Sequence, residues 1–342
     1  MRVIIAGAGI IGASAAWRLS QGGAEVWLLD AGRLGGEASA AGAGMLAPGA
    51  EFPAESGWGE MAMLSHAGYG EFVRELCVES GLGIDYRVCG ALDIVMEGEE
   101  VLGKGEALTA AEAAVLAPGL RGSGIAGAVH CAKDAVVDPV DVMRSLRRVC
   151  TARGVRVMEQ CRVLSIRGRG AVVHVATEAN GVLEADAAVV ASGAWSSQIA
   201  VHGEEEALPV PEAFPVRGHL VGYRHEPGSL GPIVRHGHTY LLQRGSGRTI
   251  AGTSQEEVGF ERKVDAATVE DIHKRAAALL PGLIGGRPEE SWMGFRPATR
   301  SYTPELRRLE GTRVWLAYGH FRNGILLAPV TAARLSGEIL AS

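Results

Sequence analysis

The first thirty residues of the chain show a strand, helix, strand pattern of apolar positions. Residues 3–6 form a short apolar run that predicts a buried strand. Residues 10–19 have helical spacing and several alanines, which predicts a helix that packs closely on its neighbours. A second apolar run, residues 26–29, predicts another strand and is followed by Asp30. Glycines fill the turn between the first strand and the helix.

Beyond residue 30 the helical and strand patterns alternate irregularly, which predicts an interrupted order of elements rather than one continuously wound sheet. The spacing predicts helices at residues 61–80, 110–118, 138–152 and 268–280, the second of them opened by a Thr109–Glu112 capping box. Short apolar runs predict strands at residues 155–158, 162–166, 172–177, 187–191, 220–223, 233–235, 240–243, 249–252, 292–295 and 314–317. Residues 35–48 are too small and glycine-rich for an ordinary helix or strand, which favours a surface for a planar ligand.

Composition narrows the class of protein. The 342 residues are 47% hydrophobic and 21% charged, and the net charge of −6 argues against nucleic acid or an anionic membrane as the main partner. The length is sufficient for two domains with a core each. With no visible signal peptide and no apolar run of the roughly 20 residues that span a bilayer, we expect a cytoplasmic protein. The five cysteines lack metal-type spacing, so we expect reduced thiols and no metal site.

Three glycines in the first turn make the physical case for a dinucleotide cradle. Gly7 permits the tight turn, Gly9 lets the backbone approach a pyrophosphate, and Gly12 lets the helix pack close to the sheet. The phosphates would meet the N–H groups at the start of the helix. Asp30 is placed to accept hydrogen bonds from ribose hydroxyls. This motif alone does not separate FAD from NAD.

Two later segments are expected to reach the same ligand. Gly193 and Trp195 follow the predicted strand at 187–191, at a second strand-to-turn crossing. Residues 317–325 are again glycine-rich and lead into an apolar helical stretch, as a lid over a bound ligand would. A nucleotide cofactor held from both ends of the chain indicates a flavin.

Five segments in order along the chain resemble the D-amino-acid oxidase family of flavoproteins, and within it the glycine oxidase branch associated with thiamine biosynthesis. They are residues 7–30, 39–48, 191–196, 294–299 and 319–329. The resemblance implies an α/β (α+β) fold in which a Rossmann-like FAD-binding domain is interrupted by a substrate domain with a mixed, largely antiparallel sheet. The implied boundaries are 1–81, 134–209 and 297–342 for the first domain, and 82–133 and 210–296 for the second.

The resemblance also implies which residues hold FAD, which we expect to be bound non-covalently. Together with the turn residues above, the expected cofactor-binding set is Gly7, Gly9, Ile10, Ile11, Gly12, Asp30, Ala31, Ala38, Ser39, Ala43, Gly44, Met45, Val163, Gly193, Trp195, His320, Phe321, Arg322, Asn323, Gly324, Ile325 and Leu326. Val163 is expected to meet adenine through backbone groups. The helix that begins near Gly324 is expected to aim its N-terminus at the flavin pyrimidine.

Five residues match family positions around the substrate. Arg296 is expected to bind the α-carboxylate with two parallel hydrogen bonds, and a structural salt bridge is the alternative interpretation. Arg322 and Tyr240 match positions near the substrate. Met45 matches a pocket wall, and Gln255 matches a pocket position that is usually apolar in glycine oxidases. The polar residue at 255 therefore favours small or polar substrates over bulky apolar ones.

The function implied by the resemblance is oxidative deamination of glycine, a small D-amino acid or N-methylglycine. Hydride would pass from Cα to flavin N5, O2 would be reduced to H2O2, and the imine would hydrolyse to a 2-oxo acid and ammonia. Two alternatives stay open: a dehydrogenase that uses a different electron acceptor, and a flavin-binding protein without catalysis. The expected partners are a small amino-acid substrate and O2, and a homo-oligomer is not excluded.

Overall fold

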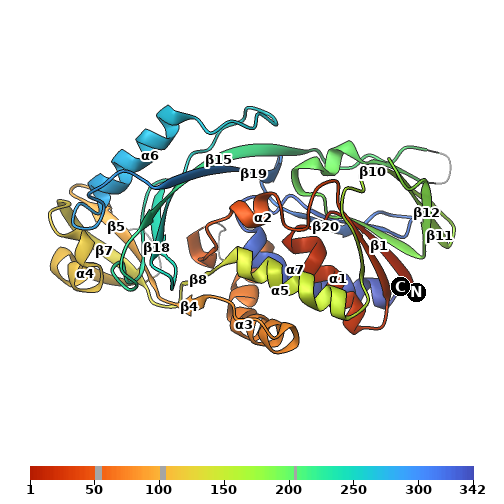
Figure 1. Ribbon diagram of the computed structural model, residues 1–342, viewed down its shortest axis with the longest axis horizontal. Coiled ribbons are helices and arrows are strands. Elements are labelled where there is room, and N and C mark those ends of the chain that lie inside the picture. Colours follow the sequence, from red (N-terminus) through yellow and green to blue (C-terminus); the bar gives the residue numbers. More distant parts are fainter. Residues whose placement is uncertain (51–55, 101–104, 204–205) are drawn as a thin grey trace.

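A long antiparallel pair of strands, β15 (Ala213–Arg224) and β19 (Glu290–Thr299), runs along the molecule and joins its two ends (Figure 1). The computed structural model describes residues 1–50, 56–100, 105–203 and 206–342. Both chain termini lie side by side at one end, next to β1 (Arg2–Ala6). The opposite end carries α4 (Ala110–Leu116) and α6 (Ala266–Leu279).

The end that carries the termini is built on a six-stranded sheet in the order β20-β21-β13-β1-β2-β9. All neighbours are parallel except β20, which pairs with β21 in the antiparallel sense. The other strands are β2 (Glu25–Leu29), β9 (Arg156–Met158), β13 (Ala187–Val190), β20 (Glu305–Arg308) and β21 (Val314–Tyr318).

Both faces of this sheet are covered, which explains why β1 is an unbroken apolar run. Val3 and Ile5 pack against helices on one face, and Ile4 packs against a four-stranded sheet on the other. The helices are α1 (Ile10–Gln21), α3 (Gly57–Ser80), α5 (Pro139–Ala152) and α7 (Gly324–Leu340). The second sheet contains β10 (Val163–Arg169), β11 (Val172–Thr177), β12 (Val182–Ala185) and β14 (Ala200–His202).

The opposite end is built on an eight-stranded sheet in the order β19-β15-β18-β17-β16-β5-β7-β6, covered by α4 and α6. Only the β16–β5 pair in it is parallel, so the sheet is mixed and largely antiparallel. Its remaining strands are β5 (Ala91–Met96), β6 (Glu106–Thr109), β7 (Ile125–Cys131), β16 (Ile233–His236), β17 (Thr239–Gln243) and β18 (Arg248–Gly252). A small sheet of β3 (Met45–Leu46), β8 (Ala135–Val137) and β4 (Tyr86–Val88) lies between the two larger ones.

Local capping signals in the sequence are confirmed. The Thr109 side chain accepts from the Glu112 backbone N–H, and the Glu112 carboxylate accepts from the Thr109 N–H, so the capping box opens α4. Asp138 caps α5 and Pro139 occupies its first turn, as expected. These short-range signals place helix starts because both partners lie within three residues.

The structure differs from the sequence-based expectations in several places. α3 begins at Gly57, four residues earlier than expected, because Ser56 caps it. The glycine-rich segment at 35–48 contains a one-turn helix, α2 (Ala38–Ala41), as well as β3. Strands β5 and β7 were not predicted, since they are stabilised by pairing with each other, and β5 also with β16 far along the chain.

The predicted fold class is confirmed, including the mixed, largely antiparallel second sheet. The domain boundaries stay a prediction. Within the described ranges, no helix is long and apolar enough to cross a membrane.

Candidate functional site

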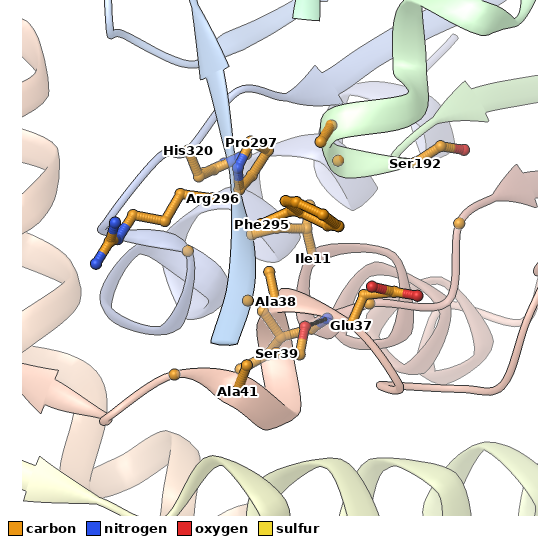
Figure 2. A pocket seen from close by; sticks show the side chains of 18 of the residues that line it. Ile11, Glu37, Ala38, Ser39, Ala41, Ser192, Phe295, Arg296, Pro297 and His320 are labelled. Atoms are coloured by element: carbon orange, nitrogen blue, oxygen red, sulfur yellow. Dashed lines mark hydrogen bonds between the residues drawn. The ribbon is translucent and has the colours of Figure 1, made fainter. Parts of the chain in front are cut away.

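A cavity of about 450 Å³ is lined by residues of both the six-stranded and the eight-stranded sheet regions, and Figure 2 shows part of its lining. It is lined by segments that are far apart in sequence. Three of them come from the chain start, at residues 6–11, 29–32 and 37–47, and others come from 161–163, 191–199, 294–297 and 320–325. Loops and strand ends therefore converge on the carboxyl edge of the parallel sheet, where α/β folds bind nucleotides.

The first glycine turn is held by close backbone contacts. Gly7 has φ of +110°, and a Cβ there would lie 2.3 Å from the carbonyl oxygen of Ala191. A Cβ on Gly12 would lie 1.9 Å from the carbonyl oxygen of Gly7, so α1 packs directly onto the turn, as predicted. Gly9 has ordinary extended backbone (φ −70°) and lines the cavity. Gly7 and Gly12 are thus required by the close backbone packing of the turn, whereas Gly9 leaves space for a ligand.

The start of α1 forms an anion-binding corner. The Ser39 hydroxyl accepts from the Ile10 N–H at 2.9 Å, and Ser39, Ile10 and Ile11 all line the cavity. The N–H groups in the first turn of a helix have no intrahelical acceptor, and the helix dipole favours negative charge there. This corner has the geometry and the sign of charge that a pyrophosphate requires.

Asp30 braces the backbone around this corner. Its carboxylate accepts from the Ala8 N–H at 2.7 Å and from the Gly32 N–H at 2.7 Å. Burial raises the pKa of this carboxyl, although the two N–H donors act in the opposite direction. Asp30 also lines the cavity. The expected contact with ribose hydroxyls stays a prediction, and bracing of the turn is a second role that the sequence did not indicate.

The segment at 43–45 is fixed from behind by Arg244. This guanidinium is buried and donates to the carbonyl oxygens of Ala43 and, at 2.6 Å, Val137. Burial lowers the pKa of Arg244 from the usual arginine value. Gly44 has φ of +75°, and a Cβ there would lie 2.0 Å from the Val137 carbonyl oxygen. The cavity wall at this point is therefore a rigid backbone surface.

The C-terminal motif closes the cavity from the opposite side. Phe321 has the left-handed φ of 47°, and its N–H donates to the Pro297 carbonyl at 2.8 Å. This hydrogen bond ties the loop before α7 to the end of β19. Asn323 precedes the helix, and its N–H donates to the His320 carbonyl at 2.8 Å. The N-terminus of α7 therefore faces the cavity, which Gly324 and Ile325 line.

His320 is the only histidine among the cavity-lining residues of the described chain, and it is uncharged at neutral pH. It is 2% exposed, and its Nε2 lies 3.1 Å from the Thr331 hydroxyl. Burial lowers the pKa of His320 from 6.5 to about 3. It therefore acts as a hydrogen-bonding residue rather than a cation.

The depressed pKa of His320 predicts a pH-dependent stability. Below pH 6.5 the His320 side chain is protonated in the unfolded chain but stays neutral in the folded chain. The free energy of unfolding should therefore decrease as the pH is lowered from 6.5 to about 3. His320→Gln, which cannot be protonated, should have a shallower decline over this range. Urea unfolding of both proteins at several pH values from 7.5 to 4 measures the difference. Equal slopes would show that His320 protonates freely in the folded protein.

Arg296 sits at the end of the cavity formed by the larger antiparallel sheet. Its side chain and that of Phe295 leave β19 on opposite sides (Figure 2). The Arg296 guanidinium donates to the Ser254 carbonyl at 3.0 Å and to the Thr253 hydroxyl at 2.6 Å. Tyr240 lines the same cavity and lies over Gly252, where a Cβ would be 2.7 Å from the tyrosine hydroxyl. A cation and a phenol thus share the cavity with the nucleotide-binding turn.

Most residues expected from the sequence do line this cavity. They are Gly7, Gly9, Ile10, Ile11, Asp30, Ala31, Ala38, Ser39, Ala43, Gly44, Met45, Val163, Gly193, Trp195, Tyr240, Arg296, His320, Phe321, Arg322, Asn323, Gly324 and Ile325. Gly12 and Leu326 lie outside its lining and pack in the turn and in the core. Their contact with FAD stays a prediction.

The expectation for Gln255 is wrong in its placement. Its side chain is exposed and is absent from the cavity lining. The neighbouring Glu256 forms a two-way backbone bridge with Arg217, and its carboxylate accepts from the Arg217 side chain at 2.7 Å. This anchor turns the chain at 255 toward solvent. Thr253, two residues earlier, occupies the cavity wall.

Sequence reasoning also missed a group at the cavity rim. Glu37 and Arg262 form an ion pair at 2.7 Å, and the Arg262 guanidinium lies over the rings of Phe295 and Trp195. All four residues line the cavity. Glu37 and Arg262 are 225 positions apart in the chain, and neither lies in a recognisable motif, so no local signal links them.

The fold and the cavity define a dinucleotide-binding protein whose second sheet contributes a cation to the ligand site. A family model described as FAD dependent oxidoreductase (DAO) matches residues 2–337. The chain therefore belongs to the DAO family of FAD dependent oxidoreductases. The predictions of the family, of an enzyme and of FAD as its cofactor are thereby confirmed.

Individual relatives agree with this assignment. Glycine oxidase of Bacillus licheniformis is 33% identical and aligns with 98% of this chain and 92% of its own length. The bifunctional protein ThiO/ThiG of Synechocystis is 34% identical over 99% of this chain, which matches 51% of that longer protein. The crystal structure of glycine oxidase from Geobacillus kaustophilus superposes with a TM-score of 0.89 at 28% identity, covering 99% of this chain and 95% of that one.

The cavity residues fit FAD. The corner of Gly9, Ile10 and Ser39 suits the pyrophosphate, because it lies at the start of α1, beside a residue without a side chain, and the Ser39 hydroxyl that accepts from Ile10 can donate its own hydrogen to a phosphate. The rigid wall at 43–45 and the N-terminus of α7 suit a planar flavin that gains negative charge on reduction. Val163, which is expected to meet adenine, is 8% exposed and lines the cavity. Non-covalent attachment stays a prediction.

Proposed function

We propose that this enzyme oxidises glycine, a small D-amino acid or N-methylglycine. The proposal rests on one arrangement: Arg296 and Tyr240 line the same cavity as the FAD-binding turn, at the end built from the antiparallel sheet. A guanidinium is the group best suited to hold a carboxylate at two points. The glycine oxidases among the relatives make an amino acid the favoured carboxylate.

Residues of this chain would bind and orient the substrate. Arg296 receives the α-carboxylate, and the Tyr240 hydroxyl donates to one of its oxygens. Met45 and Leu220 then bound the space for the side chain, since both line the cavity and belong to one hydrophobic cluster with Tyr240. Arg322 lines the same cavity. Bound FAD supplies the acceptor for the Cα hydride, with O2 reduced to H2O2. The imine is hydrolysed to a 2-oxo acid and ammonia, or to a 2-oxo acid and methylamine when the substrate is N-methylglycine.

No side-chain base is required by this proposal. The reacting amine is neutral, so Cα–H leaves as hydride and no proton need be abstracted from carbon. His320, with its pKa near 3, is a neutral hydrogen-bonding residue. The site therefore contributes orientation and charge complementarity rather than acid–base chemistry.

The proposal predicts a simple spectroscopic result. Glycine added without oxygen should bleach the flavin absorbance of the purified protein, and air should restore it with release of one H2O2 per turnover. Recovery with a dye acceptor but not with air would identify a dehydrogenase instead. If none of glycine, N-methylglycine and D-alanine bleaches the flavin, the proposed activity is contradicted.

The same assay tests substrate size. Met45, Leu220 and Tyr240 crowd the expected side-chain space, so kcat/KM should be higher for glycine, N-methylglycine and D-alanine than for D-leucine or D-phenylalanine. This expectation no longer depends on Gln255, which lies in solvent. A preference for the bulky substrates would contradict the proposed substrate class while leaving amino-acid oxidation intact.

A further inference from the structure

The Arg296 guanidinium is held in a well-defined seat, which we name the arginine socket and define as Gly218, Thr253 and Ser254. Ser254 accepts one hydrogen bond through its carbonyl oxygen, and Thr253 accepts another through its hydroxyl. Gly218 forms the floor of the socket. A Cβ at that position would lie 2.3 to 2.5 Å from the Nη1, Nη2 and Cζ atoms of Arg296. The guanidinium therefore occupies the space that any other residue at 218 would fill.

Thr253 is the side chain in the socket that directs the guanidinium. It is 7% exposed and lines the cavity. A hydroxyl has one hydrogen to donate, and that of Thr253 has the carbonyl oxygens of His219 at 3.0 Å and Ser254 at 3.2 Å within reach. With its hydrogen used there, the Thr253 oxygen presents its lone pairs to Arg296 Nη2 at 2.6 Å.

The socket is itself braced from behind. His219 is fully buried, and its backbone N–H donates to the Ser254 hydroxyl at 3.0 Å. Arg275 of α6 donates to the Thr253 carbonyl at 3.2 Å and to the Thr239 hydroxyl at 2.6 Å. These contacts attach the loop after β18 to β15, β17 and α6. The position of the Thr253 hydroxyl is thus fixed by the packing of several elements.

We propose that Thr253 is a positioning residue for the substrate carboxylate, acting through Arg296. This inference rests on the proposed function, in which Arg296 binds that carboxylate. Arginine has several rotatable bonds, and holding its planar fork in place before binding reduces the ordering cost at the moment of binding. Thr253 and Gly218 together hold the guanidinium in place before the substrate binds. Thr253 accepts a hydrogen bond from it, and Gly218 leaves the space that it occupies.

The proposal predicts an effect on substrate affinity rather than on the chemical step. Thr253→Val keeps the shape of the side chain and removes the hydroxyl, so the KM for glycine should rise about tenfold with kcat nearly unchanged. Thr253→Ser keeps the hydroxyl and should stay close to the wild type. Acetate, titrated against the flavin spectrum, should show a matching rise in Kd, which measures carboxylate binding without turnover.

A second variant reaches the same guanidinium by a different route. Gly218→Ala leaves Thr253 intact but places a methyl group where Arg296 lies, and the flexible end of Arg296 must move out of the socket. It should also raise the KM for glycine and the Kd for acetate. Gly222→Ala is the matched control, because it lies on the same strand and its Cβ meets only the side chain of Glu290, outside the cavity.

The outcomes separate this inference from the proposed function. If wild-type protein neither oxidises amino acids nor binds acetate, the proposed function fails. If the wild type does both, and Thr253→Val and Gly218→Ala bind acetate as well as Gly222→Ala does, the socket has no role in positioning and this inference is wrong. If Thr253→Val loses FAD or does not fold, the KM for glycine and the Kd for acetate are measured on Gly218→Ala and on Thr253→Ser instead.

Discussion

Arg296→Ala should reduce kcat/KM for glycine by about 10- to 150-fold, because it removes a charge-assisted contact to the carboxylate. FAD content and the flavin spectrum should stay close to wild type. Arg296 contacts Thr253 and Ser254 in the loop after β18 and lies on the opposite side of β19 from Phe295. Steady-state kinetics on the FAD-saturated variant, with the absorbance spectrum taken in parallel, measure both effects.

Arg296→Lys is the informative partner of this variant. An ammonium retains the charge but cannot reproduce the planar two-point grip, so only part of the loss should be recovered. An amine without a carboxylate, if oxidised at all, should react equally with all three proteins. Loss of FAD or of folding in Arg296→Ala, with normal turnover in the remaining holoenzyme, would assign Arg296 to the structure and place the carboxylate site elsewhere.

Gly9→Val should yield a folded protein that binds FAD at least about 100-fold more weakly than wild type. Gly9 has extended backbone that a valine can adopt, so the turn itself should not be strained. A Cβ there meets only the Ser39 hydroxyl, at 3.3 Å, and the larger side chain would fill the corner that receives the pyrophosphate. Titration of apoprotein with FAD, followed by flavin fluorescence, gives the affinity, and circular dichroism reports the fold.

Gly7→Ala provides the contrast within the same motif. Its φ of +110° is strained for any residue with a Cβ, and that Cβ would lie 2.3 Å from the Ala191 carbonyl oxygen. This variant should therefore unfold at lower temperature even without FAD, whereas apo Gly9→Val should not. If Gly9→Val binds FAD with wild-type affinity, the pyrophosphate does not lie at the start of α1.

The opening strand, turn and helix could be predicted from the sequence because the sequence signals that mark them are local. The apolar run of β1, the spacing of Gly7, Gly9 and Gly12, and the length of α1 are all visible within twenty residues. The same holds for the capping box of α4. Arg296 and Tyr240 were found through motifs that resemble a known family, and the structure places both in the cavity.

The second sheet was harder to predict because its pairing is not local. β5 and β7 are joined by about thirty residues of chain, and β5 also pairs with β16, 140 positions later. The side chains of β5 and β7 are buried by these partner strands and by α4 and α6. These contacts leave no periodic pattern in the sequences of the two strands. A short apolar run does not by itself distinguish a buried strand from a buried helix segment.

By itself, the sequence determined that this protein has a dinucleotide turn at its start, a closing motif at its end and a candidate carboxylate-binding arginine between them. Only the tertiary structure decided which side chains surround that arginine. Gln255 is turned into solvent by the bridge between Glu256 and Arg217, and Thr253 takes the place in the cavity. Gly218 lies on β15 and Thr253 follows the end of β18, so their meeting at Arg296 is a consequence of the pairing of β15 with β18 and β19. Short-range patterns encode turns and helix ends, whereas the order around a functional group depends on segments that become neighbours only when the chain folds.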